Sequence, residues 1–373
     1  MIKMYDYSLD YVNMYIDEIG GEVITEVDKN RGFWKAVFPE SFNGKKLNSA
    51  FFYDILSLKI DDLCKKYDSI NSYYQFAFFS SINIKKVHLG EKKQSDRNAN
   101  RKKYVDLLLS NNYFRKNIVN YIPLIKPAYY NDSSFKNLQT VVENRLKRIN
   151  FGIRKVFNYN KFIKRKQRIE ILDDLKIKVC PYCNRQYVTK LDIDMGKIIG
   201  DIDHFYSQNY FTLFALSLYN FVPSCKICNS LFKSDINADI QYPYRMKCDS
   251  NVTFELVDKN GKVTPASLYG WEEKLRIKII PKSADRKKAN REIEFFKLNA
   301  QYELHNEYAK SILYKKIFTN NSLLTQLESL FLHNKINMTQ GDIKKVVYGF
   351  DVDNIDIRES PLALLTKDLY EKY

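Results

Sequence analysis

The apolar residues of this chain follow a helical spacing through much of its first half. Between residues 134 and 168 they recur every three or four positions, at Leu138, Val141, Val142, Leu146, Ile149 and Ile153. This spacing is typical of a helix with one buried stripe. A similar pattern covers residues 104–118, whereas residues 92–103 are polar, basic and poor in apolar side chains, which predicts a loop. The first 170 residues are therefore predicted to be mainly helical.

Between residues 179 and 233 the pattern changes to that of short strands. Tyr187, Thr189, Leu191 and Ile193 alternate with their neighbours, residues 194–197 have the composition of a turn, and a second run covers residues 198–204. This is the pattern of a β-hairpin. A loop, a short strand at residues 219–222 and a helix from about Cys228 are predicted to follow.

The C-terminal part is predicted to combine a second hairpin with helices. Residues 252–263 form the hairpin, with Asn260-Gly261 at its turn, and residues 292–318 form one long helix. The buried stripe of that helix would consist of Leu298, Tyr302, His305, Ala309 and Ile312. The chain is thus predicted to be an α+β protein of three regions: helical residues 1–170, a small core at 171–245, and a hairpin with helices at 246–373.

The charge of the chain favours a polyanionic partner. Its 373 residues are 45% hydrophobic and 28% charged, which is typical of globular proteins, and the formal net charge is +16. A basic surface attracts polyanions, of which nucleic acid is the most common inside a cell. The alternative is that the lysines only solvate the surface.

No targeting segment is visible in the sequence. The first residues contain no basic region followed by an apolar stretch, and the longest apolar tract, residues 211–222, is interrupted by polar residues and too short for a membrane span. A soluble cytoplasmic protein is therefore expected.

Four of the six cysteines form two C-x-x-C pairs, Cys180 with Cys183 and Cys225 with Cys228. Two such pairs can bind one zinc ion in a closed tetrahedral site, and a closed site leaves no position for water, so this zinc would be structural. The first pair, Cys-Pro-Tyr-Cys, also matches the active-site tetrapeptide of glutaredoxins. That chemistry requires a helix N-terminus after a buried strand, whereas a hairpin is predicted here. Cys64 and Cys248 belong to no such pattern.

Between and after the cysteine pairs lie residues suited to phosphodiester hydrolysis, which needs a base for water and a cation for the phosphate. His204 is the candidate base. Asp203 and the side-chain oxygen of Asn229 are candidate ligands for Mg²⁺, which prefers oxygen donors and retains several waters. Neighbouring residues of a strand point to opposite faces, so Asp203 and His204 can act together only where the strand ends.

These residues resemble a known enzyme family. The run Asp203-His204-Phe205-Tyr206, then Asn220, then Pro223-Ser224-Cys225-x-x-Cys228-Asn229 and Lys233, resembles the HNH (ββα-metal) endonucleases in their zinc-knuckle form, with Asn as the last motif residue. Within that family the chain is most similar to the PtuB-like HNH subunits of Septu and retron-associated phage defence. Residues 296–302 with His305, and residues 360–363, also resemble stretches of those proteins.

The resemblance implies a role for each matching residue. His204 corresponds to the general base, Asp203 and Asn229 to the Mg²⁺ ligands, and Asn220 to the residue that braces the loop beside the base. Lys233 corresponds to a basic residue that steadies the phosphate. The resemblance further implies a ββα-metal core, DNA as the substrate, a role in prokaryotic anti-phage defence, and an ATPase partner of the Septu kind.

Several other polar residues have simpler interpretations. His305 is expected to be a hydrogen-bonded core residue, and His88 and His333 have no accompanying motif. Asp201 is either a carboxylate that supports a metal ligand or a solvated one. For the chain as a whole, the alternative to a nuclease is a zinc-stabilised nucleic-acid-binding protein without catalysis.

A basic tract precedes the first cysteine pair and contains no acidic residue. Its candidate phosphate-binding side chains are Arg145, Lys147, Arg148, Arg154, Lys155, Lys164, Arg165 and Lys166, with Lys161 and Arg168 in the same stretch. Tyr159 and Phe162 are interleaved with them, where packing is a more common use than stacking on bases. A second basic group occupies residues 286–291. The tracts themselves do not distinguish DNA from RNA.

Overall fold

The computed structural model describes residues 1–111, 113, 121–192, 197–198, 200–258, 261, 275–282 and 286–373. The chain divides into two compact units. The helical unit consists of Met4–Lys176 and Val188–Tyr244, and the terminal unit consists of Met1–Lys3, Ile177–Tyr187 and Arg245–Tyr373. The predicted α+β class is confirmed as a mixture of helices and small sheets, since each sheet in the described ranges is a pair of short antiparallel strands.

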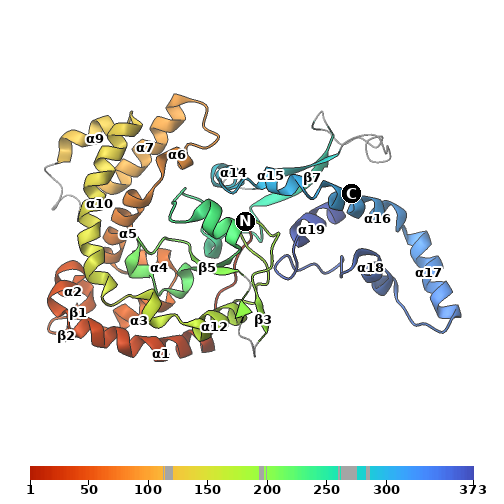
Figure 1. Ribbon diagram of the computed structural model, residues 1–373, viewed down its shortest axis with the longest axis horizontal. Coiled ribbons are helices and arrows are strands. Elements are labelled where there is room, and N and C mark those ends of the chain that lie inside the picture. Colours follow the sequence, from red (N-terminus) through yellow and green to blue (C-terminus); the bar gives the residue numbers. More distant parts are fainter. Residues whose placement is uncertain are drawn as a thin grey trace. The chain divides into compact units, whose positions relative to one another are not determined.

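The helical unit is built mainly from helices joined by short connections (Figure 1). These are α1 (Leu9–Asp28), α2 (Arg31–Val37), α3 (Ser49–Ser57), α4 (Ile60–Lys66), α5 (Asp68–Ser81), α6 (Ile84–Val87), α7 (Gln94–Leu109), α9 (Ile122–Ala128), α10 (Asp132–Arg154), α11 (Tyr159–Phe162) and α12 (Arg165–Leu175). Its strands are β1 (Phe42–Asn43), β2 (Lys46–Leu47), β3 (Lys190–Asp192), β4 (Lys197–Ile198), β5 (Asp201–His204) and β6 (Phe221–Ser224).

Helix α10 confirms the predicted buried stripe and runs along α5 (Figure 1). Its buried face includes Leu138, Val142, Leu146 and Ile153. The helix does not continue to residue 168 as predicted. It ends at Arg154, because the side chain of Asn158 accepts a hydrogen bond from the Lys161 amide and so starts α11.

The loop predicted at residues 92–103 is wrong, because most of this segment belongs to α7. Its buried face includes a charged residue, which the apolar pattern does not reveal. The guanidinium of Arg101 is buried and donates hydrogen bonds to Asp132 and to the carbonyl oxygens of Tyr129 and Tyr130. A paired arginine thus occupies a buried position of a helix in a segment that was predicted to be a polar loop.

The predicted hairpin of residues 187–204 is confirmed only in its first part, where β3 pairs with β4. Residues 194–196 of its predicted turn lie outside the described residues, as does residue 193 at the end of the first predicted strand. The second run is not one strand. It breaks at Gly200, which has φ +92°, and β5 pairs with β6 instead. The strand predicted at residues 219–222 is displaced to Phe221–Ser224, and the predicted helix near Cys228 is η5 (Ile227–Lys233), a π-helical segment.

The terminal unit contains one sheet and several helices. They are β7 (Val252–Val257), β8 (Arg276–Pro281), α14 (Arg286–Phe295), α15 (Leu298–Glu303), α16 (Asn306–Phe318), α17 (Asn321–His333), α18 (Gln340–Tyr348) and α19 (Ala363–Lys372). β7 pairs with β8. Residues 259–260 and 262–263, which include Asn260 of the predicted turn and the predicted partner strand, lie outside the described residues.

The single helix predicted at residues 292–318 is also wrong, although its buried stripe is confirmed in part. The segment forms α14, α15 and α16, and the first break follows from Lys297, which has a left-handed φ of +52°. Leu298, Tyr302, Ala309 and Ile312 are buried, whereas His305 is half-buried. In the part of the chain that the structure describes, no helix has both the length and the apolar character needed to cross a bilayer.

Candidate functional site

The four paired cysteines converge as predicted. The sulfur atoms of Cys180, Cys183, Cys225 and Cys228 all lie within 4.8 Å of one another, and all four residues are buried and free of disulfides. Sulfurs around a tetrahedral zinc with 2.3 Å bonds lie about 3.8 Å apart, so this cluster fits one zinc ion. Because both pairs contribute, the geometry matches a metal site rather than a two-cysteine redox motif.

The first cysteine pair sits on a tight backbone turn within the terminal unit. The amide of Cys180 donates to Gln186 O at 2.9 Å, and the amide of Asn184 donates to Cys180 O at 2.7 Å. Asn184 adopts a left-handed φ of +52°, which asparagine tolerates better than most residues. This turn holds the two thiols on the same side of the chain.

Two segments that the resemblance singled out pack on this turn. The amides of Leu362 and Leu364 donate to the backbone and side-chain oxygens of Asn184 at 2.7 and 2.9 Å. The hydroxyl of Tyr302 donates to Cys183 O at 2.7 Å. The segments near residues 302 and 362 therefore fix the turn that carries Cys180 and Cys183.

Asp203 and His204 end strand β5 in the helical unit. The strand pairs antiparallel with β6, so that Asp203 lies opposite Val222 and His204 opposite Phe221. Gly200 precedes the strand, and a Cβ at this position would lie 2.9 Å from Ser224 O. Residues 205–220 form the loop between the two strands, and η5 follows β6, so two strands and a helical segment surround the candidate residues.

Asn220 closes this loop. It is fully buried, and its Oδ1 accepts a hydrogen bond from the Tyr206 amide at 2.8 Å. Its Nδ2 donates to Tyr206 O at 3.0 Å and to Phe214 O at 2.9 Å. These three bonds join the start of the loop to its middle, which is the contact pattern expected of a residue that braces the loop.

His204 is oriented by the same loop. Its Nε2 lies 3.0 Å from Ala215 O, so Nε2 carries the proton in the neutral ring and Nδ1 is the basic nitrogen. The ring also packs edge-on against Tyr159 and Phe221, with centroid distances of 4.6 and 5.3 Å. Burial lowers the pKa of His204 to about 4, against the opposing effects of Ala215 O and Asp203. The imidazole is therefore neutral near pH 7.

Asp203 and Lys233 form a buried ion pair. Lys233 Nζ donates to Asp203 Oδ1 at 3.0 Å and to His204 O at 2.7 Å, and both side chains are almost fully buried. The sequence predicted that Lys233 would steady the phosphate. The structure instead directs its ammonium group to the end of β5, where it holds the carboxylate and the backbone in place.

Asn229 lies on η5, and its Nδ2 is 3.3 Å from Asp201 Oδ2. Because Asp201 engages the nitrogen end of the amide, Oδ1 is the atom that Asn229 offers to a cation. Of the two interpretations of Asp201 left open above, the contact favours support of a ligand residue over simple solvation.

Asp203, His204 and Asn229 line one cavity, which we call the His204 cavity. Its volume is about 650 Å³, and its walls include Tyr159, Arg168, Asp203, His204, Asn229 and Asp235. A carboxylate and an amide oxygen suit Mg²⁺, and the remaining coordination positions would be filled by water and a bound phosphate. Within the described ranges, the cysteine cluster is the only group of three or more His, Cys, Asp or Glu residues whose ligand atoms lie this close together.

Sequence reasoning did not assign Arg168 and Tyr159 to this cavity. Arg168 is exposed, and its guanidinium lies 5.5 Å from the centre of the Tyr159 ring. Its position in the basic tract was a signal of phosphate binding, but nothing in the local pattern places it beside His204. It is the basic side chain in the wall of the His204 cavity.

Two residues outside the cavity, Tyr73 and Asn150, also hold the loop, and no pattern in the sequence indicates either of them. The hydroxyl of Tyr73 lies 2.9 Å from Asn150 Oδ1 and 3.1 Å from Tyr210 O, and it accepts from the Leu213 amide at 3.2 Å. Asn150 Nδ2 donates to Tyr210 O at 2.9 Å. Helices α5 and α10 thereby support the loop close to Ala215.

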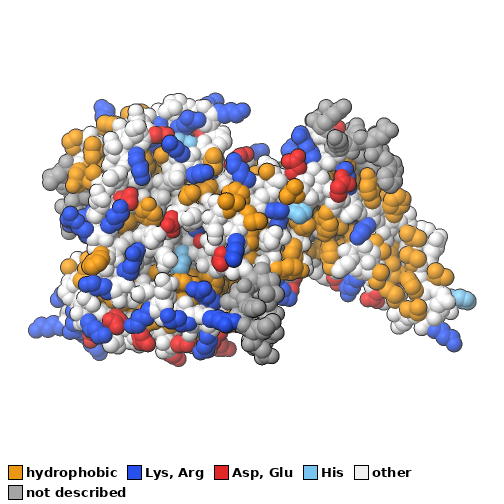
Figure 2. All heavy atoms as spheres, viewed as in Figure 1, with side chains coloured by type: hydrophobic (Ala, Val, Ile, Leu, Met, Phe, Trp, Pro, Cys, Tyr) orange, Lys and Arg blue, Asp and Glu red, His pale blue; other side chains and the backbone are white. Residues whose placement is uncertain are grey.

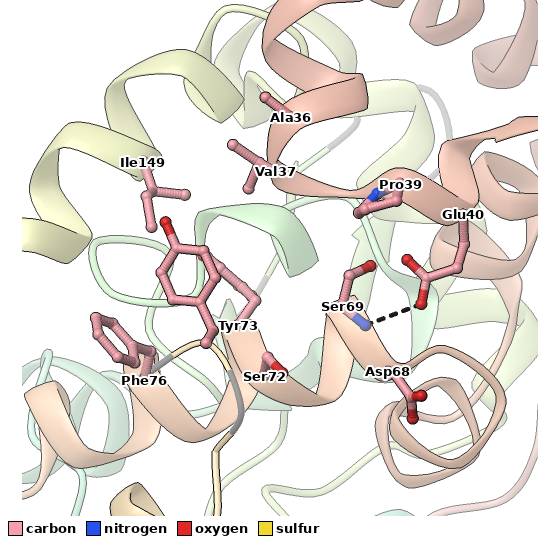
Figure 3. A pocket seen from close by; sticks show the side chains of 11 residues that line it. Ala36, Val37, Pro39, Glu40, Asp68, Ser69, Ser72, Tyr73, Phe76 and Ile149 are labelled. Atoms are coloured by element: carbon pink, nitrogen blue, oxygen red, sulfur yellow. Dashed lines mark hydrogen bonds between the residues drawn. The ribbon is translucent and has the colours of Figure 1, made fainter. Parts of the chain in front are cut away.

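Tyr73 also borders a second cavity, of about 610 Å³, on the side of α5 that faces α2 (Figure 3). In it the amide of Ser69 donates to the Glu40 carboxylate at 3.0 Å, and Val37, Phe76 and Ile149 supply an apolar wall. None of the candidate catalytic or metal-binding residues lines this cavity. The chemistry predicted from the sequence therefore belongs to the His204 cavity.

The predicted phosphate-binding residues of the basic tract are all exposed. They lie on α10, on α12 or in the segment that connects the two helices. Three lysines of the tract already pair with carboxylates, because Lys147 contacts Glu143, Lys161 contacts Glu22 and Glu26, and Lys166 contacts Glu18 and Glu170. Tyr159 and Phe162 are buried, so packing is their use. Figure 2 shows lysine and arginine side chains spread over the visible face rather than collected in one patch. Net charge alone therefore does not locate a binding surface.

No protein-family model, curated protein or solved structure matches this chain.

Proposed function

We propose that this chain is an HNH-type endonuclease that hydrolyses DNA phosphodiester bonds with the aid of a divalent cation. The observation that carries the proposal is the orientation of His204, whose Nε2 is engaged by Ala215 O while its ring borders a polar cavity beside Asp203. A neutral imidazole with a basic Nδ1 is the group that water activation requires. The Asn220 bonds that fix the loop further support this assignment.

In the proposed reaction, His204 accepts a proton on Nδ1 as a water molecule attacks the phosphorus atom. Asp203 and the Oδ1 of Asn229 would hold a Mg²⁺ ion, which neutralises charge on the phosphate and the leaving oxygen when bound. Lys233 pairs with the Asp203 carboxylate and fixes the end of β5 through His204 O. Arg168 is the candidate contact for a phosphate oxygen at the cavity wall.

The cysteine cluster has a structural part in this proposal. Its four buried thiols could hold one zinc ion in a closed shell, and such a site has no position left for substrate or water. The hydrolytic chemistry is assigned to the His204 cavity alone.

A plasmid-cleavage assay tests the proposal. Wild-type protein with Mg²⁺ should convert supercoiled DNA to nicked or linear forms, and EDTA should stop the reaction. His204→Ala should cleave about 10²- to 10⁴-fold more slowly, since that is the usual contribution of a general base. The matched control is His333→Ala, an exposed histidine at the end of α17, which should cleave at the wild-type rate.

Two results would overturn the assignment. Cleavage by His204→Ala at the wild-type rate would remove His204 from the mechanism. Tight DNA binding by wild-type protein without cleavage in Mg²⁺, Mn²⁺ or other divalent cations would favour the non-catalytic binding protein instead.

We place the activity in prokaryotic anti-phage defence, with an ATPase as partner, because the motif resembles the PtuB-like subunits. A nuclease acting on DNA in its own cell needs restraint, so the purified chain alone should cleave slowly. Vigorous multiple-turnover cleavage by the chain alone, unchanged by candidate ATPases, would contradict this restraint.

A further inference from the structure

The His204 cavity adjoins another cavity in the helical unit. This Lys85 cavity has a volume of about 680 Å³ and is lined by the end of α5, the start of α6 and the first turns of α10. Asp235 belongs to the walls of both cavities. Asp235 is therefore the residue at which the two cavities meet.

The Lys85 cavity carries two available positive charges. Lys85 on α6 and Lys136 on α10 are exposed, and neither forms an ion pair with another residue that the structure describes. Among the described residues, Lys136 Nζ donates to a neutral amide alone, Gln139 Oε1, at 3.2 Å. In the basic tract, by contrast, Lys147, Lys161 and Lys166 all contact carboxylates.

The acidic residues of the cavity already have partners. Asp132 pairs with Arg101 and lies 3.9 Å from His88 Nδ1. Asp235 accepts hydrogen bonds from Ser207 Oγ at 2.5 Å and from Asn209 Nδ2 at 2.6 Å. Arg101 offsets the charge of Asp132, so the two lysines outweigh the one carboxylate whose hydrogen-bond donors are neutral, Asp235, in the field that a bound anion meets.

The walls of the two cavities are joined by hydrogen bonds. The segment after η5 is attached to the end of α5, because Asn83 N donates to Asn237 O at 2.9 Å and Asn237 Nδ2 donates to Ser81 Oγ at 2.8 Å. Gln139 Nε2 donates to Phe79 O and Ile82 O, both at 2.8 Å, which ties α10 to the same turn. The lysines and His204 therefore stand on one rigid framework.

We propose that the polynucleotide strand cut at His204 continues into the Lys85 cavity, where Lys85 and Lys136 bind phosphates that flank the scissile one. The proposal rests on the nuclease function and defines the path of its substrate. Arg168 lies in the wall of the His204 cavity and the two lysines in the adjoining cavity, with Asp235 between them. Phosphates neutralised by lysines release counterions, which gives the binding a measurable dependence on salt.

The test measures DNA binding by the full-length His204→Ala protein, which keeps the DNA intact. Fluorescence anisotropy with a labelled duplex gives the slope of log K against log salt concentration. Adding Lys85→Ala and Lys136→Ala should reduce the magnitude of this slope by about 1.8, or about 0.9 for each lost phosphate contact. The matched control adds Lys29→Ala and Lys65→Ala, two exposed lysines outside the basic tract that pair with Glu26 and Asp62, and should change the slope by less than half as much.

A second measurement locates the contacts along the strand. DNA carrying one neutral methylphosphonate is scanned across the positions that flank the scissile phosphate. Neutral linkages on one side should weaken binding of the His204→Ala protein, but not of the variant that also lacks both lysines. This loss of sensitivity identifies the phosphates that the lysines contact, and both pairs of lysines are exposed enough for the fold to be retained.

Three outcomes would overturn the path: an unchanged slope after removal of Lys85 and Lys136, a larger change in the control, or equal methylphosphonate sensitivity in both proteins. Failure of the nuclease proposal looks different. In that case wild-type protein leaves plasmid uncut, while the salt slope of the variant without Lys85 and Lys136 still differs from that of the control variant. If only the path is wrong, wild-type protein cleaves plasmid and the two variants have the same salt slope.

Discussion

The cysteine cluster and the His204 cavity are both built from polar side chains that converge in the fold, yet their organisation differs. The cluster consists of four identical, buried donors that all lie within 4.8 Å of one another. The cavity contains different groups, each held by another residue: His204 by Ala215 O, Asp203 by Lys233 and Asn229 by Asp201. A closed symmetric site suits a permanent ion, whereas an open asymmetric one can admit a substrate.

The comparison separates two kinds of sensitivity to substitution. Loss of one thiol removes a ligand that nothing else in the cluster replaces, so the fold should suffer. Loss of a group that points into the His204 cavity should affect activity, whereas loss of a residue that holds such a group should affect stability and activity together. The following predictions test this division, from the largest expected effect to the smallest.

Cys225→Ser should cause the largest loss, because structural zinc contributes folding energy on the order of 10 kcal/mol in small zinc domains. We expect little soluble protein, and metal analysis should find zinc well below one ion per chain. Cys248→Ser is the control, since Cys248 is exposed and outside the cluster. A well-folded Cys225→Ser protein that unfolds like wild type would contradict the structural role of the site.

Lys233→Met should lower the free energy of unfolding by about 3–5 kcal/mol, because it leaves the buried Asp203 carboxylate without its partner. The exposed pair of Lys147 with Glu143 gives the comparison, and Lys147→Met should cost no more than about 1 kcal/mol. Urea unfolding of both variants measures the difference. Equal stabilities would show that Lys233 is not a positioning residue and would restore its interpretation as a phosphate contact.

Asn220→Ala should cost about 3 kcal/mol, because it leaves the Tyr206 amide and the Tyr206 and Phe214 carbonyl oxygens without this partner. DNA cleavage should fall as well, since the same loop carries Ala215 O. Asn209→Ala in the same loop is the control, because Asn209 is exposed and should cost less than about 1 kcal/mol. A stable Asn220→Ala protein with normal cleavage would disprove the bracing role.

The pH profile of cleavage provides the finest test. A base acts only in its neutral form, and burial lowers the pKa of His204 to about 4. The cleavage rate that depends on this base should therefore reach its full value above about pH 5.5 and decrease as the pH falls through about 4. Single-turnover rates between pH 4 and 8 measure the profile. An inflection near 6.5, the ordinary value for histidine, would show that the ring is more solvated than the structure indicates.

Much of the candidate chemistry could be predicted from the sequence because it depends on close spacing. The two C-x-x-C pairs, the adjacent Asp203 and His204, and the apolar stripe of α10 are each visible within a few turns of chain. Such features obey local geometry, since two cysteines three positions apart can reach one metal and residues at helical spacing share a face. The convergence of the four cysteines and the α+β character followed from these patterns.

The remaining features were decided by contacts between distant residues. The pairing of β5 with β6, the burial of Arg101 in α7, and the direction of the Lys233 ammonium group depend on partners that the local sequence does not identify. The same holds for Arg168 beside His204 and for Asp201 beside Asn229. A lysine in a sequence has the same charge whether it meets a phosphate or a buried carboxylate, and only the tertiary structure fixes its partner and its exposure to solvent.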